Sequence, residues 1–104
     1  MGAGLLAAVV ILKERAIVAA FRDAGATSAA TATTPAALGV HEGLAFRKLR
    51  RRAVLREAGQ GLFYLDEQSW EALRRIRRQL AVAVAILALV AAAAYLLRRL
   101  AAHS

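Results

Sequence analysis

The feature that most constrains this chain is an apolar segment near its C-terminal end. Leu80 to Leu97 is a run of 18 residues without Gly, Pro or charge. With a rise of about 1.5 Å per residue, an α-helix of this length is roughly 27 Å long, close to the hydrocarbon thickness of a bilayer. Nine of these residues are Leu, Ile or Val, and each favours membrane insertion by about 0.3–0.6 kcal/mol. The segment therefore predicts a transmembrane helix over residues 80–97.

The alternative is a central helix in a soluble all-α domain. A helix that is apolar on every side needs a shell of other helices to cover it, and the upstream residues are basic and rich in expected loops. Tyr95 and the arginines at both ends of the run are also typical of side chains at a membrane interface. We therefore favour the membrane span.

Charge predicts the orientation of the span. The chain carries six basic residues between positions 47 and 56, and four more in a basic juxtamembrane segment, 74–79. The tail, residues 98–104, has two. Positive charge favours the cytoplasmic side, so the bulk of the chain is expected in the cytoplasm of a bacterium, with the C-terminus outside the inner membrane. The juxtamembrane arginines are Arg74, Arg75, Arg77 and Arg78.

Length and composition limit what remains outside the span. The chain has 104 residues, which leaves room for one small domain, expected over residues 13–73. It has no Cys, so disulfides, thiol nucleophiles and cysteine metal sites are excluded. The formal charge of +8 favours anionic partners such as lipid head groups, nucleic acid or an acidic protein surface. The Ala- and Arg-rich composition is also typical of high-GC bacterial coding bias.

The apolar N-terminal segment, residues 1–12, leaves three interpretations open. Its apolar run is followed, not preceded, by the charged Lys13-Glu14-Arg15, which is the reverse of a signal peptide. It is either a short or partial first membrane span with the N-terminus outside, or the interfacial start of a cytoplasmic helix, or an artefact of start-site choice. Eleven apolar residues are too few to cross a bilayer unaided.

The first part of the domain is expected to be helical. Apolar residues recur at helical spacing between residues 12 and 22, and Gly25 is a candidate left-handed C-cap. Residues 26–34 are predicted to form a loop, and Thr34-Pro35 then starts a very short helix that Gly39 ends. The residues expected to face the core from the first helix are Leu12, Ala16, Ile17, Ala20 and Phe21.

A basic helix, a β-hairpin and a long helix are expected next. The basic helix opens at His41-Glu42, with Leu44, Phe46, Leu49 and Ala53 or Val54 inward. Residues 54–58 and 62–65 read as strands around a Gly59-Gln60-Gly61 loop that supplies positive φ angles. Asp66 caps a helix that continues into the membrane, with Glu67 and Glu71 near its start and Trp70 packed on the hairpin.

This order of elements resembles a winged helix-turn-helix domain over residues 12–70. The segment that carries the resemblance is "TPAALGVHEGLAFRKLRRRAVLREAGQGLFYLDEQSW", in which "LGV" looks like the turn, "HEGLAFRKLRRR" the recognition helix and "VLREAGQGLFYLD" the wing. The sequence is also similar to a type of small uncharacterised bacterial membrane protein with an "LREAG…G…YLDE…W" segment. It departs from the winged-helix pattern because the helix before the turn is a single turn long.

The expected fold class is thus α+β and mostly helical: a small winged-helix-like domain of three helices and a β-hairpin, continuing into a C-terminal transmembrane helix. The expected function is a non-enzymatic interaction or structural module, with the bilayer, another envelope protein or a second copy as partner. Membrane-anchored DNA binding is the alternative. The candidate contacts to nucleic acid or anionic lipid are Arg47, Lys48, Arg51, Arg52, Arg56 and Gln60.

The sequence offers no catalytic, metal or cofactor motif, and neither cofactor nor metal is predicted. His41 and His103 lie on opposite sides of the membrane in the expected topology, so they cannot act as a pair. The carboxylates at positions 66, 67 and 71 are explained by helix capping. The glycine pair at 59 and 61 falls far short of a phosphate-binding motif.

Overall fold

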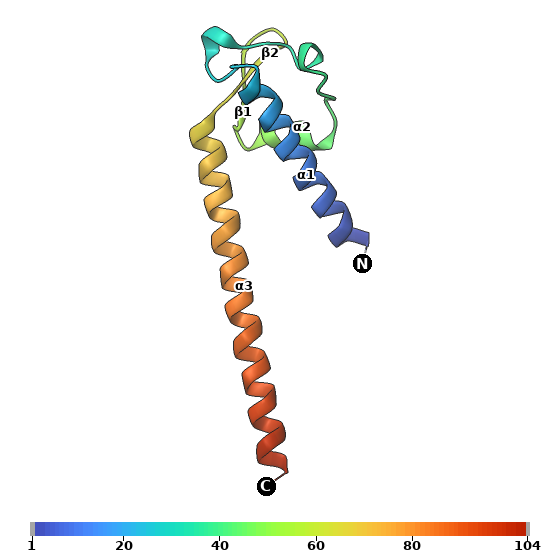
Figure 1. Ribbon diagram of the computed structural model, residues 1–104, viewed down its shortest axis with the longest axis vertical. Coiled ribbons are helices and arrows are strands. Elements are labelled where there is room, and N and C mark those ends of the chain that lie inside the picture. Colours follow the sequence, from blue (N-terminus) through green and yellow to red (C-terminus); the bar gives the residue numbers. More distant parts are fainter. Residues whose placement is uncertain (1, 104) are drawn as a thin grey trace. The chain divides into compact units, whose positions relative to one another are not determined.

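A computed structural model describes residues 2–103, which form two compact units that adjoin in sequence between Glu71 and Ala72. Most of these residues are helical, and one antiparallel hairpin accompanies the helices, as the sequence predicts (Figure 1). In chain order the elements are α1 (Gly2–Asp23), the 3₁₀ turns η1 (Ala29–Thr31) and η2 (Ala36–Leu38), α2 (Leu44–Arg51), β1 (Leu55–Gly59), β2 (Leu62–Leu65) and α3 (Glu67–Ala102).

Helix α1 includes residues 2–12 of the N-terminal apolar segment and continues past them without a break, so the expected boundary at residue 12 falls inside a helix. The helix ends where the sequence predicts. Gly25 has a φ of 72° and donates its N–H to the carbonyl of Arg22 at 3.0 Å, while Ala26 donates to Phe21 at 2.9 Å. These two bonds form a Schellman motif, which satisfies the last carbonyls of the helix.

The face of α1 that packs into the domain differs in part from the expected one. The prediction is confirmed for Ile17 and Phe21, which are buried, but it is wrong for Leu12 and Ala16, which are exposed. Glu14 takes a place on the buried face, 1% exposed, although its charge suggested a surface position. The buried side chains recur at three- and four-residue intervals along one side of the helix; they are Val10, Glu14, Ile17, Val18 and Phe21.

The segment after α1 is more ordered than the expected loop. Thr33 pairs with Phe63 of β2 in an isolated antiparallel bridge, with N–H to carbonyl distances of 2.9 Å and 2.7 Å in the two directions. Before it, Ser28 and Thr31 hydrogen-bond through their hydroxyls at 3.0 Å and hold the turn η1. The bridge places one extended residue beside β2, which propensity alone could not indicate in a stretch of Ala and Thr.

The expected short helix is present as the 3₁₀ turn η2. The Thr34 hydroxyl accepts the N–H of Ala37 at 3.2 Å, which confirms its capping role. Gly39 ends the turn with a φ of 68°, a conformation that a residue with a side chain rarely adopts.

Helix α2 starts later than predicted. Gly43 is its N-cap and Leu44 its first residue, so the predicted start at His41-Glu42 is wrong. Residues 40–42 have no regular secondary structure, and the N–H of Arg47 makes the first helical bond, to Gly43 at 3.0 Å. Leu44 is also not inward. It lies about 200° around the helix from Phe46 and is 45% exposed, while Ala45 is buried in its place.

The hairpin follows the prediction closely. Leu55 pairs with Leu65 and Gly59 with Leu62, and a bulge interrupts the register between Glu57 and Gly59. Of the three loop residues expected to supply positive φ, Gly61 alone does so, with a φ of 74°. The hairpin also contributes to the core, since the rings of Phe63 and Phe46 meet edge to face with centroids 5.2 Å apart.

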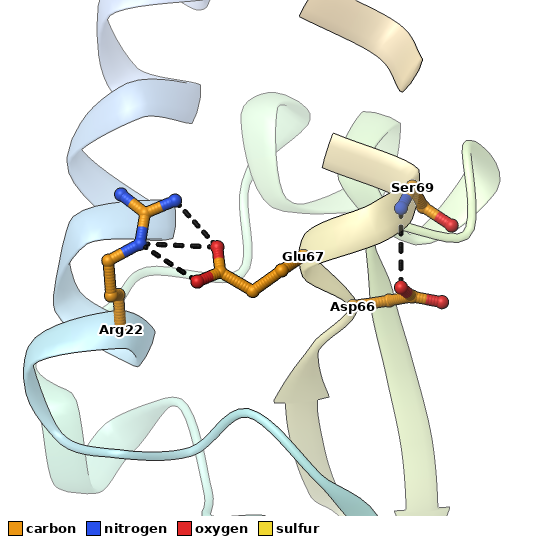
Figure 2. A network of polar contacts seen from close by, with 4 residues as sticks. All are labelled: Arg22, Asp66, Glu67 and Ser69. Atoms are coloured by element: carbon orange, nitrogen blue, oxygen red, sulfur yellow. Dashed lines mark hydrogen bonds and ion pairs between the residues drawn. The ribbon is translucent and has the colours of Figure 1, made fainter. Parts of the chain in front are cut away.

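Helix α3 begins as predicted and is unusually long. The carboxylate of Asp66 accepts the N–H of Ser69 at 3.2 Å, which is an N-cap bond (Figure 2). The helix then runs for 36 residues without interruption. Within residues 2–103 it is the one helix long and apolar enough to cross a membrane, and every residue from Leu80 to Leu97 is exposed.

Candidate interaction surface

Helix α2 presents a basic face because of its residue spacing. Ala45, Phe46 and Leu49 share one side of the helix and are buried. The remaining positions point outward, and all of them from 47 to 52 other than Leu49 are Lys or Arg. The basic residues near the end of α2 also suit the negative end of the helix dipole. We define the basic face as Arg47, Lys48, Arg50, Arg51 and Arg52, all exposed.

The charge of the first unit is concentrated on this face. Residues 2–71 carry nine Lys or Arg and seven Asp or Glu, a net charge of +2. The basic face holds five of the nine and no acidic residue. The domain is therefore close to balanced overall, and its positive potential is local. A local patch can recognise an anionic surface, whereas a uniformly basic domain would bind such surfaces without orientation.

Arg50 was not among the predicted site residues. Its guanidinium carbon lies 4.8 Å from the centroid of the Phe63 ring, and its Nη2 lies 3.8 Å from a carboxylate oxygen of Glu57. The stacking on Phe63 fixes the side chain between α2 and the hairpin. A signal was present in the sequence, because Arg50 follows Phe46 by four residues and so borders the buried side of the helix.

The two hairpin residues proposed as contacts differ in availability. Gln60 lies exposed at the tip of the hairpin. Arg56 is engaged within the domain, since its Nε lies 2.9 Å from a carboxylate oxygen of Asp66 and donates to the carbonyl of Ala53 at 3.3 Å. An arginine that already pairs with a carboxylate in the domain gains less free energy from binding an anionic partner than the residues of α2 do.

The four juxtamembrane arginines lie on α3 and belong to the second unit. Arg74, Arg75 and Arg78 are exposed and Arg77 is partly exposed. The second unit contains six Lys or Arg and no Asp or Glu, so it carries most of the formal charge of the chain. At its far end Arg99 lies over the ring of Tyr95, 5.8 Å from its centroid.

An ion pair ties the end of α1 to the start of α3 within the first unit. Arg22 donates to both carboxylate oxygens of Glu67, with the shortest distance, 2.6 Å, from Nη2 to Oε1 (Figure 2). These hydrogen bonds lower the pKa of Glu67, although burial acts in the opposite direction, and they raise the pKa of Arg22. Both side chains are partly exposed, so the pair adds little to the stability of the fold.

An apolar groove of about 590 Å³ lies on the first unit, between α1 and the chain from Leu38 to Ala45. Leu6 and Val9 line it from α1, and Val40 and Leu44 from the other side. Lys13 and His41 are the ionisable residues in its lining. This groove was not predicted, because its two walls, residues 6–20 and 38–45, are distant in sequence and Leu44 was expected to face the core.

The sequence predicts no metal site, but a fold can bring together His, Asp and Glu side chains that are distant in sequence. Among residues 2–103, no three His, Asp or Glu side chains come together to hold a metal ion. His41 is exposed in the segment before α2, and His103 follows the end of α3 in the second unit.

Comparisons with known proteins give no relative for this chain. No family model, no curated protein and no solved structure matches it.

Proposed function

We propose that this chain is a non-enzymatic module anchored in the bacterial inner membrane, which uses its basic face to hold an anionic partner near the cytoplasmic surface. The observation that carries the proposal is the pairing of two exposed features. One is the apolar length of α3, on which every residue from Leu80 to Leu97 is exposed. The other is a basic face that a folded core holds toward solvent.

We propose the membrane anchor because the apolar side chains of residues 80–97 require an apolar solvent. Leaving residues 80–97 in water would expose nine large aliphatic side chains, each worth about 1.5–3 kcal/mol on full burial. Lipid can cover all sides of the helix at once, and its backbone groups are already bonded internally. The four arginines before the span then favour placing the domain in the cytoplasm and the tail outside.

The winged-helix-like description of the domain is part of the proposal. Its support is the order of α1, the short turn η2, α2 and the β1–β2 hairpin. The bridge between Thr33 and Phe63 adds an extended residue beside the hairpin, in keeping with a wing that packs on the domain. The brevity of η2 is the main departure, since it is one 3₁₀ turn.

The partner that we favour is an acidic protein surface. The basic face combines charged residues with Arg50 fixed against Phe63, and the hairpin residue Arg56 is neutralised by Asp66. The positive patch is therefore compact and confined to one short helix. Such a patch suits a localised acidic site, which gains specificity from complementary charge.

Membrane-anchored DNA binding is the second candidate. It is favoured by four exposed cations on α2 and at its C-cap, Arg47, Lys48, Arg51 and Arg52, at spacings that let a helix reach phosphates in a major groove. Four phosphate contacts would give a salt dependence with a slope of about −4 in log–log form.

In-cell photo-crosslinking separates the two candidates. A photoreactive residue replaces Lys48 on the basic face, and a matched chain carries it at Gln68, which is exposed outside that face. We expect a protein adduct from position 48 that is absent from position 68 and is lost in the variant R47Q/R51Q/R52Q. Adducts with DNA would favour the second candidate. Adducts with neither protein nor DNA would refute an interaction role for α2.

A further inference from the structure

The N-terminal half of α1 carries apolar side chains on two opposite faces. Val10 lies on the face that packs into the domain, in line with Ile17 and Phe21. Leu5 and Leu12 point the other way and are 70% and 63% exposed. At about 100° per residue, positions 5, 9 and 12 lie within roughly 60° of each other. Residues 2–12 contain no polar side chain, so this stretch has no face suited to water.

The groove extends this apolar surface onto a second part of the domain. Leu44 is 45% exposed and lines the groove opposite Leu6 and Val9. The late start of α2 turns Leu44 away from the core and toward this groove. The fold thus joins two segments distant in sequence into one exposed apolar surface. We call this surface the lipid-facing edge. It consists of five exposed residues: Leu5, Leu6, Val9, Leu12 and Leu44.

The shape of this edge favours a bilayer over a protein partner. A protein docked in the groove would cover Leu6 and Val9, which line it, and leave Leu5 and Leu12 in water, because neither of them belongs to the groove lining. A lipid interface can cover both. Lys13 and Arg15 follow the apolar stretch directly and are exposed, which places cations where an embedded helix would meet phosphate groups.

We propose that the lipid-facing edge embeds in the head-group region of the same membrane that α3 anchors, so that the domain touches the bilayer at two places. This inference rests on the proposed anchoring by α3. It selects the interfacial interpretation of the N-terminal segment over a partial span.

Helix length and end chemistry set the geometry of this contact. Residues 2–12 form about 16 Å of helix, roughly half of a hydrocarbon core. The first N–H groups of any helix lack intrahelical partners and need water or head groups. The stretch therefore lies along the surface, its apolar sides about 5–10 Å into the head-group and acyl boundary, rather than pointing its end into the hydrocarbon.

Depth measurements on the full chain test this contact. The chain has no Cys, so single nitroxide labels are attached at Leu12→Cys and Leu44→Cys in vesicles of phosphatidylethanolamine and phosphatidylglycerol. Thr27→Cys, at an exposed position outside the candidate contacts, serves as the aqueous control and Leu89→Cys as the control within the span. We expect the accessibility ratio of oxygen to a water-soluble nickel chelate at positions 12 and 44 to exceed that at position 27 several-fold. It should remain below the ratio at position 89.

The alternative outcomes are distinct. Aqueous values at positions 12 and 44, with a lipid value at 89, would overturn the second contact and leave the anchor intact. An aqueous value at 89 would overturn the proposed anchoring itself. Spin–spin broadening at position 12 would show that a second copy covers the edge. A label at Leu5→Cys that reports the opposite head-group region would show a full crossing, and either result overturns the inference.

Discussion

The folded domain and residues 80–97 of α3 both contain many large apolar side chains, but the domain buries most of those in its core and the helix exposes them. In the domain, Phe21, Phe46 and Leu49 are almost fully covered by other side chains. From Leu80 to Leu97 of α3, every residue is exposed. Apolar content alone therefore does not say where a residue will lie, because burial requires a second element to pack against. The domain supplies such elements, whereas in our proposal the helix obtains its cover from lipid.

The N-terminal half of α1 stands between these two cases. One of its faces packs into the domain through Val10, and the other remains open at Leu5 and Leu12. It teaches that a single helix can belong to a protein core and still present a surface that suits a membrane.

The sharpest way to break the comparison is to place charge in the span. Each Arg at the centre of a membrane helix costs about 2.5–3.5 kcal/mol. The double variant L87R/L89R should therefore cancel the insertion energy of the whole segment. We expect the chain to move from the membrane to the soluble or aggregated fraction on cell fractionation. Q60R adds charge at the exposed hairpin tip and should leave the membrane fraction unchanged. Membrane retention of L87R/L89R would contradict the span.

The stability of the folded domain should depend on core packing rather than on membrane insertion. Phe46→Ala removes a buried ring and its edge-to-face partner contact with Phe63, which should cost about 3–5 kcal/mol of unfolding free energy. Urea unfolding in detergent micelles can be followed through Trp70, the single tryptophan of the chain and a buried one. Leu62→Ala, at an exposed hairpin position, is the matched control and should change stability little. Equal effects from the two variants would show that the core is not built around Phe46.

The ion pair between Arg22 and Glu67 should give the smallest effect, and one that depends on pH. The pKa of Glu67 in the fold is below its ordinary value of 4.5, so its contribution is present above that pH and is lost as the pH falls through the folded value. Glu67→Gln should cost about 0.2–1 kcal/mol at neutral pH, as for other exposed pairs. The cost should vanish in acid, as measured by the same urea unfolding.

Glu42→Gln removes an exposed carboxylate elsewhere in the domain and is the control for that measurement. A pH-independent difference between Glu67→Gln and the natural chain would assign the effect to packing rather than to charge.

Local patterns predicted the elements whose signals are complete within a few residues. The Gly25 cap, the Thr34 and Asp66 caps and the hairpin around Gly61 are all present where the sequence indicates them. Capping bonds and positive φ angles involve neighbours in the chain, so their energies can be read from short stretches. The outward direction of Arg47 and Lys48 is likewise confirmed by helical spacing.

Predictions that needed a partner element were less successful. The start of α2 was placed three residues early, because residues 40–42 after the turn at Gly39 have no regular secondary structure and no local residue signals this. Leu44 was assigned to the core because it is apolar. It is exposed because it lies about 200° around the helix from the buried Phe46. Of the candidate contacts, Arg56 is engaged by Asp66. Arg50 was missed, because its spacing from Phe46 indicates only that it borders the buried side of α2, and its contact with Phe63 depends on the hairpin.

The sequence by itself determined the long apolar helix, the basic composition of α2 and the hairpin, because periodicity, charge and turn chemistry act over neighbouring residues. Tertiary structure alone decided that Glu14 lies buried in α1, that Thr33 pairs with Phe63 and that Leu44 joins α1 in an exposed apolar surface. Each of these depends on which segments meet in space, and the free energy of such a meeting is shared between residues far apart in the chain.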